Sequence, residues 1–107
     1  MAQSVIPYET PQDVGSGVTS SYGTFIVKQV HVFHGIVTVA FEIKLTRDAS
    51  SEAHIMEGLP YAKGRFVNVA ILQGQNVIAA YMNATVFTLK ASISSGLSIS
   101  GCFSYVT

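Results

Sequence analysis

IVTVAFEIKL, residues 36–45, is the stretch that decides the fold class of this chain. Its large apolar side chains occupy every second position from Val37 to Leu45, and smaller or charged residues such as Thr38 and Glu42 lie between them. A period of two places alternate side chains on opposite faces of an extended strand. In a helix the same residues would be scattered around the circumference. We therefore expect a strand with one buried face over residues 36–45.

The residues on either side extend this strand into a series. Residues 25–33 have the β-branched and aromatic composition of a strand, and His34-Gly35 predicts a compact hairpin turn because Gly tolerates positive φ. Further strands are predicted at residues 54–56, 65–72, 77–82, 85–93 and 97–106. The turns between them are predicted at Gly58-Leu59-Pro60-Tyr61, Gln73-Gly74-Gln75-Asn76 and Ser94-Ser95-Gly96. This pattern predicts one all-β domain over residues 24–107, an antiparallel β-sandwich of jelly-roll-like type.

Residues 1–23 have a different character. Pro7, Pro11, Gly15 and Gly17 interrupt a stretch rich in Ser and Thr that shows no sustained period. We expect an N-terminal arm or linker, used for attachment or for subunit contacts. The same residues lack the basic and apolar regions of a signal peptide, so nothing marks the chain for export.

The composition is rich in apolar residues and poor in charge. Hydrophobic residues make up 49% of the chain and charged residues 11%, against about 25% charged in an ordinary soluble domain. A lone subunit of this size would expose a surface with few charges, so we expect copies of the chain to cover one another in a homo-oligomer. The formal net charge of zero argues against nucleic acid as a partner, and the longest apolar runs are too interrupted to span a membrane.

The sequence lacks recognisable motifs for catalysis, cofactor binding and metal binding. There is no G-x-S-x-G elbow, the six acidic residues show no paired spacing, and Gly15-Ser16-Gly17 lacks the third glycine of a dinucleotide fingerprint, since Ser20 stands there. His31 and His34 should begin on opposite strand faces, and no spacing supplies a third ligand for them or for His54. We expect no enzyme activity, no catalytic residue, no cofactor and no metal.

Two smaller features carry predictions of their own. Cys102, the single cysteine, lies between Gly101 and Phe103 in an apolar run and is interpreted as a small buried hydrophobe. Tyr61, Lys63 and Arg65 form an aromatic and basic cluster that could stack on a sugar and hydrogen-bond to it. The alternative is an ordinary loop with Tyr61 packed at its base.

The order of these pieces resembles the C-terminal head domain of bacteriophage tail-fibre and minor structural proteins. The resemblance covers residues 24–107. It is carried by the segments Val27–His34, Gly35, Ile36-Val37-Thr38-Val39, Gly58-Leu59-Pro60-Tyr61, Ala84-Thr85-Val86-Phe87-Thr88-Leu89 and Ile93-Ser94-Ser95-Gly96-Leu97-Ser98-Ile99-Ser100-Gly101-Cys102-Phe103-Ser104-Tyr105.

The resemblance implies a β-sandwich that trimerises around a three-fold axis and forms a knob on the virion. In that case the chain is a structural protein of the phage particle, anchored to other virion proteins through residues 1–23. The alternative that it implies is a receptor module of a tail fibre that binds a host surface saccharide. Family members usually carry this head on a long shaft, so a stand-alone virion protein and a piece of a longer fibre both stay open.

Overall fold

The computed structural model describes residues 10–107, and in this range the chain is all-β. Its elements are β1 (Gln12–Asp13), a 3-10 turn η1 (Gly15–Gly17), β2 (Gly23–Phe33), β3 (Ile36–Leu45), β4 (His54–Met56), β5 (Phe66–Gln73), β6 (Asn76–Asn83), β7 (Val86–Leu89) and β8 (Ser98–Val106). The prediction of an all-β fold is confirmed, and β3 and β4 have the predicted bounds.

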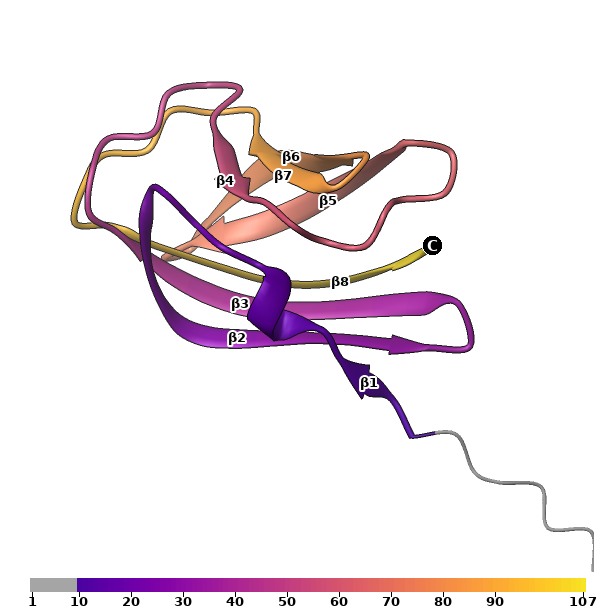
Figure 1. The fold of residues 1–107 in the computed structure, drawn as a ribbon. Helices are drawn as coiled ribbons and strands as arrows, with labels where there is room; N and C mark the ends of the chain where they lie inside the picture. The colour runs from indigo at the N-terminus through magenta and orange to yellow at the C-terminus, as the bar shows by residue number, and fades with distance from the viewer. Residues whose placement is uncertain (1–9) are drawn as a thin grey trace, which may run out of the picture.

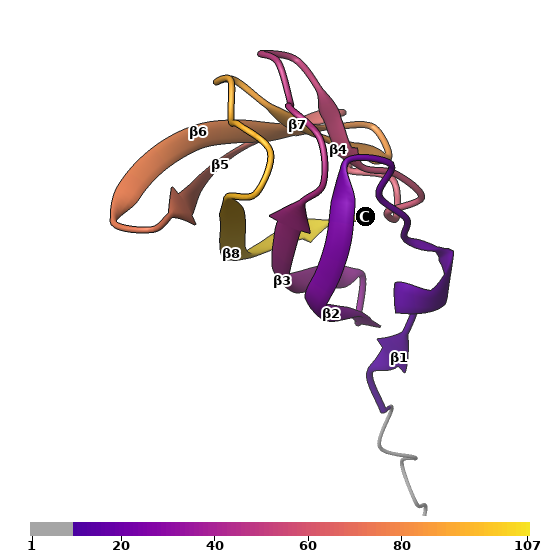
Figure 2. The ribbon, with the colours of Figure 1, turned by 90° about the vertical axis from the view of Figure 1, so that its left-hand side faces the viewer.

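The eight strands form one antiparallel sheet in the order β1-β2-β3-β8-β5-β6-β7-β4. The sheet curls, so that β2, β3 and β8 face β4, β5, β6 and β7 (Figure 1, Figure 2). The predicted division into two sheets of a sandwich is not confirmed, because Leu72 of β5 pairs with Ser100 of β8 and joins the halves. We call β2-β3-β8 the first half of the sheet and β5-β6-β7-β4 the second half.

The hairpin of β2 and β3 turns at the predicted residues. His34 and Gly35 have φ values of 50° and 74°, the two positive φ angles that a mirror-image two-residue turn requires. The register runs from Phe33 opposite Ile36 to Gly23 opposite Leu45, with a bulge between Phe25 and Val27. Because a bulge increases local twist, it helps β2 to follow the curl of the sheet.

The described part of the predicted arm packs on the domain, whereas residues 1–9 lie outside the described residues. The backbone N–H of Val14 donates to the carbonyl of Val30 in β2, and Thr19 exchanges two backbone hydrogen bonds with Glu57, just after β4. Residues 14–19, which we call the strap, therefore connect the first half of the sheet to the far edge of the second. Val18 of the strap is fully buried.

The strap passes close to a glycine of the second half. Gly58 has a φ of 81°, and a Cβ atom added to it would lie 2.0 Å from the carbonyl oxygen of Gly17. Only a residue without a side chain accepts both this conformation and this approach. Gly58 therefore positions the strap. The chain reverses later than predicted, in a turn at residues 62–65 where the backbone N–H of Arg65 donates to the carbonyl of Ala62, and not at Gly58-Leu59-Pro60-Tyr61.

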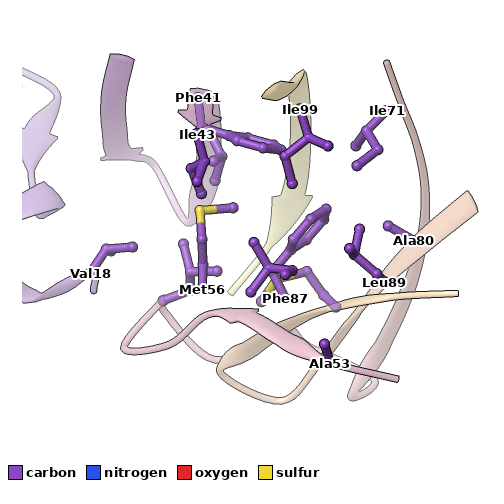
Figure 3. Packing of buried hydrophobic residues seen from close by; sticks show 14 of the residues in the cluster. Val18, Phe41, Ile43, Ala53, Met56, Ile71, Ala80, Phe87, Leu89 and Ile99 are labelled. Atoms are coloured by element: carbon purple, nitrogen blue, oxygen red, sulfur yellow. The ribbon is translucent and has the colours of Figure 1, made fainter. Parts of the chain in front are cut away.

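The core lies between the two halves of the curled sheet. Phe87 of β7 packs edge-on against Phe41 of β3, with ring centroids 5.4 Å apart, and stacks on Phe103 of β8 at 5.2 Å. Figure 3 shows Phe41 and Ile43 pointing toward Met56 and Phe87 from the opposite half. Side chains from strands far apart in sequence thus hold the halves together.

Candidate functional site

The hairpin of β5 and β6 is apolar on its inward face and largely apolar on its outward face. Its inward face carries Val67, Val69 and Ile71 from β5 and Ile78, Ala80 and Met82 from β6. Of these, Val67, Val69 and Ile78 are only half-buried. Its outward face carries Phe66, Asn68, Ala70 and Leu72 from β5 and Val77, Ala79, Tyr81 and Asn83 from β6. A strand pair that is largely apolar on both faces is typical of strands covered on both sides, but this hairpin leaves large apolar side chains exposed on its outward face.

The turn end of the hairpin exposes two large aliphatic side chains. Val77 is 71% exposed and Leu72, directly opposite it, is 46% exposed. Leu72 also lies beside Ser100 in the register, so the outward surface continues without a charge onto β8.

The same outward surface contains Cys102. Its position opposite Ala40 places it outward, and it is exposed. The interpretation of Cys102 as a buried hydrophobe is therefore wrong. Strand alternation turns every second side chain away from the core. Cys102 therefore points outward, while its neighbours Gly101 and Phe103 point inward and are half-buried.

The other end of the hairpin carries an aromatic pair, of which Phe66 is exposed and Tyr81 is half-buried. The rings of Phe66 and Tyr81 have centroids 6.4 Å apart and are tilted by 47°. Phe66 is 58% exposed. The register places Asn83 opposite Phe66 and Asn68 opposite Tyr81, so two amide side chains share this outward face.

Two cations and one carboxylate surround the aromatic pair. The Arg65 guanidinium lies 5.2 Å from the centroid of the Phe66 ring, and the Lys90 ammonium lies 5.3 Å from that of Tyr81. The Tyr81 hydroxyl donates a short hydrogen bond to Glu52. We name the set Glu52, Arg65, Phe66, Asn68, Tyr81 and Lys90 the aromatic site. It holds three of the twelve charged residues of a charge-poor chain.

Hydrogen bonds and backbone conformation hold the charged groups of the aromatic site in place. The Nε of Arg65 donates to the side-chain oxygen of Asn83 at 3.1 Å. The bond to Glu52 is the main cause that raises the pKa of Tyr81 above its ordinary value, since it favours the protonated phenol. Glu52 and Arg65 have φ values of 71° and 75°, a region that non-glycine residues seldom occupy and that marks positions worth testing for function.

The structure separates the three residues of the predicted ligand-binding cluster. Tyr61 is 54% exposed, and the loop is anchored beneath it by Tyr105, whose hydroxyl donates to the carbonyl of Pro60 at 2.8 Å. Lys63 is exposed and contributes its backbone N–H to the carbonyl of Val106. Arg65 turns toward Phe66 and Asn83. Within residues 10–107, no ring, cation–π or hydrogen-bond contact joins Tyr61 or Lys63 to Arg65.

Sequence reasoning placed Phe66 and Tyr81 in strands without assigning them a role. The period of two along β5 would have placed Phe66 outward. That Tyr81 lies next to it depends on the register across the Gln73–Asn76 turn, which the pattern of one strand does not show.

One of the histidines lies near the aromatic site, since His54 lines a hollow with Glu52 and pairs with Thr88, the residue opposite Tyr81. His31 is opposite Thr38 on the outward face of the first half, and the Nδ1 of His54 lies 3.8 Å from a carboxylate oxygen of Glu57. Across residues 10–107 no three His, Cys, Asp or Glu side chains are grouped closely enough to hold a metal ion. The same range contains no helix with the length and apolar character needed to cross a membrane.

Comparison with known proteins adds no relative to this picture. The likeness to phage head domains stays a prediction from the order of sequence segments. No family model, curated protein or solved structure matches the chain.

Proposed function

We propose that this chain is a non-enzymatic structural protein of a phage virion, which forms a homotrimeric surface knob and is anchored through residues 1–23. The observation that carries the proposal is the turn end of the β5–β6 hairpin, whose outward face leaves the apolar side chains of Leu72 and Val77 uncovered. In this proposal the two halves of the curled sheet act as the layers of a sandwich, and sister copies cover the turn end of the outward face, at Leu72 and Val77.

The energetics favour a covered hairpin. Removing a Val or Leu side chain fully from water stabilises a protein by about 1.5–3 kcal/mol, and each copy would contribute Leu72 and Val77. The neighbouring surface on β8 is uncharged, so covering it would leave no charged group buried without a partner. A second copy of the same chain supplies an equally apolar surface, which is what a homo-oligomer interface needs.

The oligomer is tested by the molar mass in solution. Light scattering coupled to gel filtration in dilute neutral buffer should give the mass of three chains for the wild type. Val77→Glu should lower that mass to one chain, because it puts a charge into the contact. The matched control is Ile26→Glu, since Ile26 is also exposed, at 55%, but lies on the bulge of β2. A wild type that is monomeric and soluble contradicts the proposal.

The virion assignment needs a separate experiment. Immunogold electron microscopy of particles produced from the genome that encodes the chain should place label at regular positions on the capsid or tail. Particles that carry no label would contradict a structural role in the virion, whatever the oligomeric state.

A second candidate function is the recognition of a saccharide by the knob. The aromatic site favours it, because exposed aromatic rings beside a few polar groups are characteristic of small-ligand sites. A glycan array probed with the purified oligomer tests it. Robust binding to a defined set of glycans supports receptor recognition. An array with no bound glycan contradicts it and leaves the structural role as the proposed function.

A further inference from the structure

We infer that the aromatic site binds an acidic sugar residue, a pyranose ring that bears a carboxylate. The inference rests on the second candidate function and adds the residues and the class of ligand. Three properties of the site carry it: an exposed aromatic surface, an excess of cationic groups, and side-chain amides on the same face.

The aromatic surface suits one face of a sugar ring. A pyranose has a face of C–H groups, and an exposed aromatic ring is a flat apolar partner for such a face. Phe66 is 58% exposed, and the Tyr81 ring beside it is tilted by 47°, so the two rings form a shallow, open V. The hollow lined by Glu52, Phe66, Asn68, Tyr81 and Lys90 has a volume of about 280 Å³, just below the usual range for drug-sized ligands, which favours a single small ring.

The charges select an acidic ligand. Arg65 lies over the Phe66 ring and Lys90 over the Tyr81 ring, so they bring two positive charges to the site, and Glu52 brings one negative charge that already accepts the hydrogen bond of Tyr81. Two positive charges and one negative charge give the site a net positive charge. The Nε bond to Asn83 orients the Arg65 guanidinium, and the two terminal nitrogens of such a planar fork match the two oxygens of a carboxylate.

The amides supply partners for hydroxyl groups. Asn68 lies on the outward face beside Tyr81, and Asn83 lies beside Phe66. An amide side chain both donates and accepts hydrogen bonds, as a sugar hydroxyl does. The ring, the carboxylate and the hydroxyls of one acidic sugar therefore each have a partner within the aromatic site.

The site is organised before any ligand arrives. Phe66 and Tyr81 lie on paired strands, Arg65 is held by Asn83, and Tyr81 is held by Glu52. Groups that are already ordered lose little freedom on binding. This order allows a shallow site to bind a small ligand with measurable affinity.

The inference is tested by titrating the purified oligomer with glucuronic acid, glucose and acetate, followed by amide chemical shifts in NMR spectra. We expect glucuronic acid to bind at least about tenfold more tightly than glucose or acetate, the factor for one charge-assisted hydrogen bond. Shifts should centre on β5, β6 and Lys90. Equal affinities for glucuronic acid and glucose would overturn the acidic class of ligand.

Matched variants locate the site. Phe66→Ala should weaken glucuronic acid binding by about tenfold through loss of the stacking surface, and Arg65→Gln should reduce it to the level of glucose. The controls are Tyr61→Ala and Lys63→Gln, an exposed aromatic and an exposed cation of the neighbouring loop, which should leave binding unchanged. Binding that survives Phe66→Ala, or that is lost in Tyr61→Ala, would overturn the site.

The molar mass of each variant separates this inference from the proposals on which it depends. Phe66→Ala should keep the wild-type mass, and a dissociated Phe66→Ala would show that the aromatic site is a subunit contact instead. Binding on the glycan array that does not depend on Phe66 would leave the second candidate function standing and reject the site. An array with no bound glycan would reject both.

Discussion

β3 and the β5–β6 hairpin are both rich in apolar residues, but they are covered to very different extents. The inward residues of β3, from Val37 to Leu45, are at most 3% exposed. Beyond Ile36, the outward face of β3 carries small or charged side chains. Half of the inward residues of the hairpin are fully buried and the other half are only half-buried. On its outward face Phe66, Leu72 and Val77 are exposed. The comparison shows that the apolar face of β3 is fully buried within one subunit, whereas the hairpin keeps apolar side chains that another molecule could bury.

The sharpest way to break this comparison is to remove the same side chain from each region. Ile43→Ala in β3 should lower the free energy of unfolding by about 2–5 kcal/mol, because Ile43 is fully buried and its removal leaves a cavity. Ile78→Ala in β6 should cost about half as much or less, since Ile78 is only half-buried. Urea unfolding of the two variants measures the difference. Equal losses would show that the two regions are covered alike.

A second substitution tests whether the strap holds the two halves of the sheet together. Gly58→Ala should cost about 1–3 kcal/mol for its left-handed backbone alone, and the clash with the Gly17 carbonyl should add to that cost. Gly96→Ala is the matched control, because Gly96 has a φ of 89° and open space around it. Thermal unfolding of both should show a clearly larger loss at Gly58. If Gly96→Ala is as damaging, the contact between strap and second half contributes nothing.

The smallest expected effect concerns Tyr105, which joins β8 in the first half to Pro60 in the loop between β4 and β5 of the second half. Tyr105→Phe removes that hydrogen bond and should cost about 1 kcal/mol at neutral pH. Burial also raises the pKa of Tyr105 above its ordinary value of 10.0.

This shift in pKa gives Tyr105 a signature in alkaline solution. Above pH 10 the unfolded phenol ionises while the folded one stays protonated, so the stability that Tyr105 contributes is present below pH 10 and is lost as the pH rises. Urea unfolding from pH 8 to 11 should therefore show a shallower decline for Tyr105→Phe than for the wild type. Parallel declines would mean that Tyr105 ionises equally easily in both states.

The strands from β2 to β8 were predictable because each leaves a local signal, whereas β1 lies in the predicted arm and was missed, and β7 ends at Leu89, earlier than predicted. Alternation located β3 and the β-branched residues located β2, while the turn residues divided the rest, and even the short β4 was found between polar residues and Gly58. Cys102 was misjudged because Gly101 and Phe103 made the run look uniformly apolar. Its outward position depends on its pairing with Ala40, 62 residues earlier in the chain.

The aromatic site was predictable only in part. Arg65 was predicted as a ligand-binding residue together with Tyr61 and Lys63. In the structure Tyr61 and Lys63 lie in the loop before β5, and Arg65 contacts Phe66 and Asn83 instead. Phe66 and Tyr81 meet through the register of β5 and β6, and Glu52 joins them from before β4.

By itself, the order of residues determined the all-β class, the position of the strands and the shortage of charge, because alternation, turn residues and composition act over a few neighbouring positions. Only the tertiary structure decided that the strands form one curled sheet, that the strap connects its edges, and that the aromatic site forms at one end of a half-covered hairpin. Those features depend on pairing between residues far apart in the chain, and a one-residue change of register would turn every side chain of a strand to the opposite face.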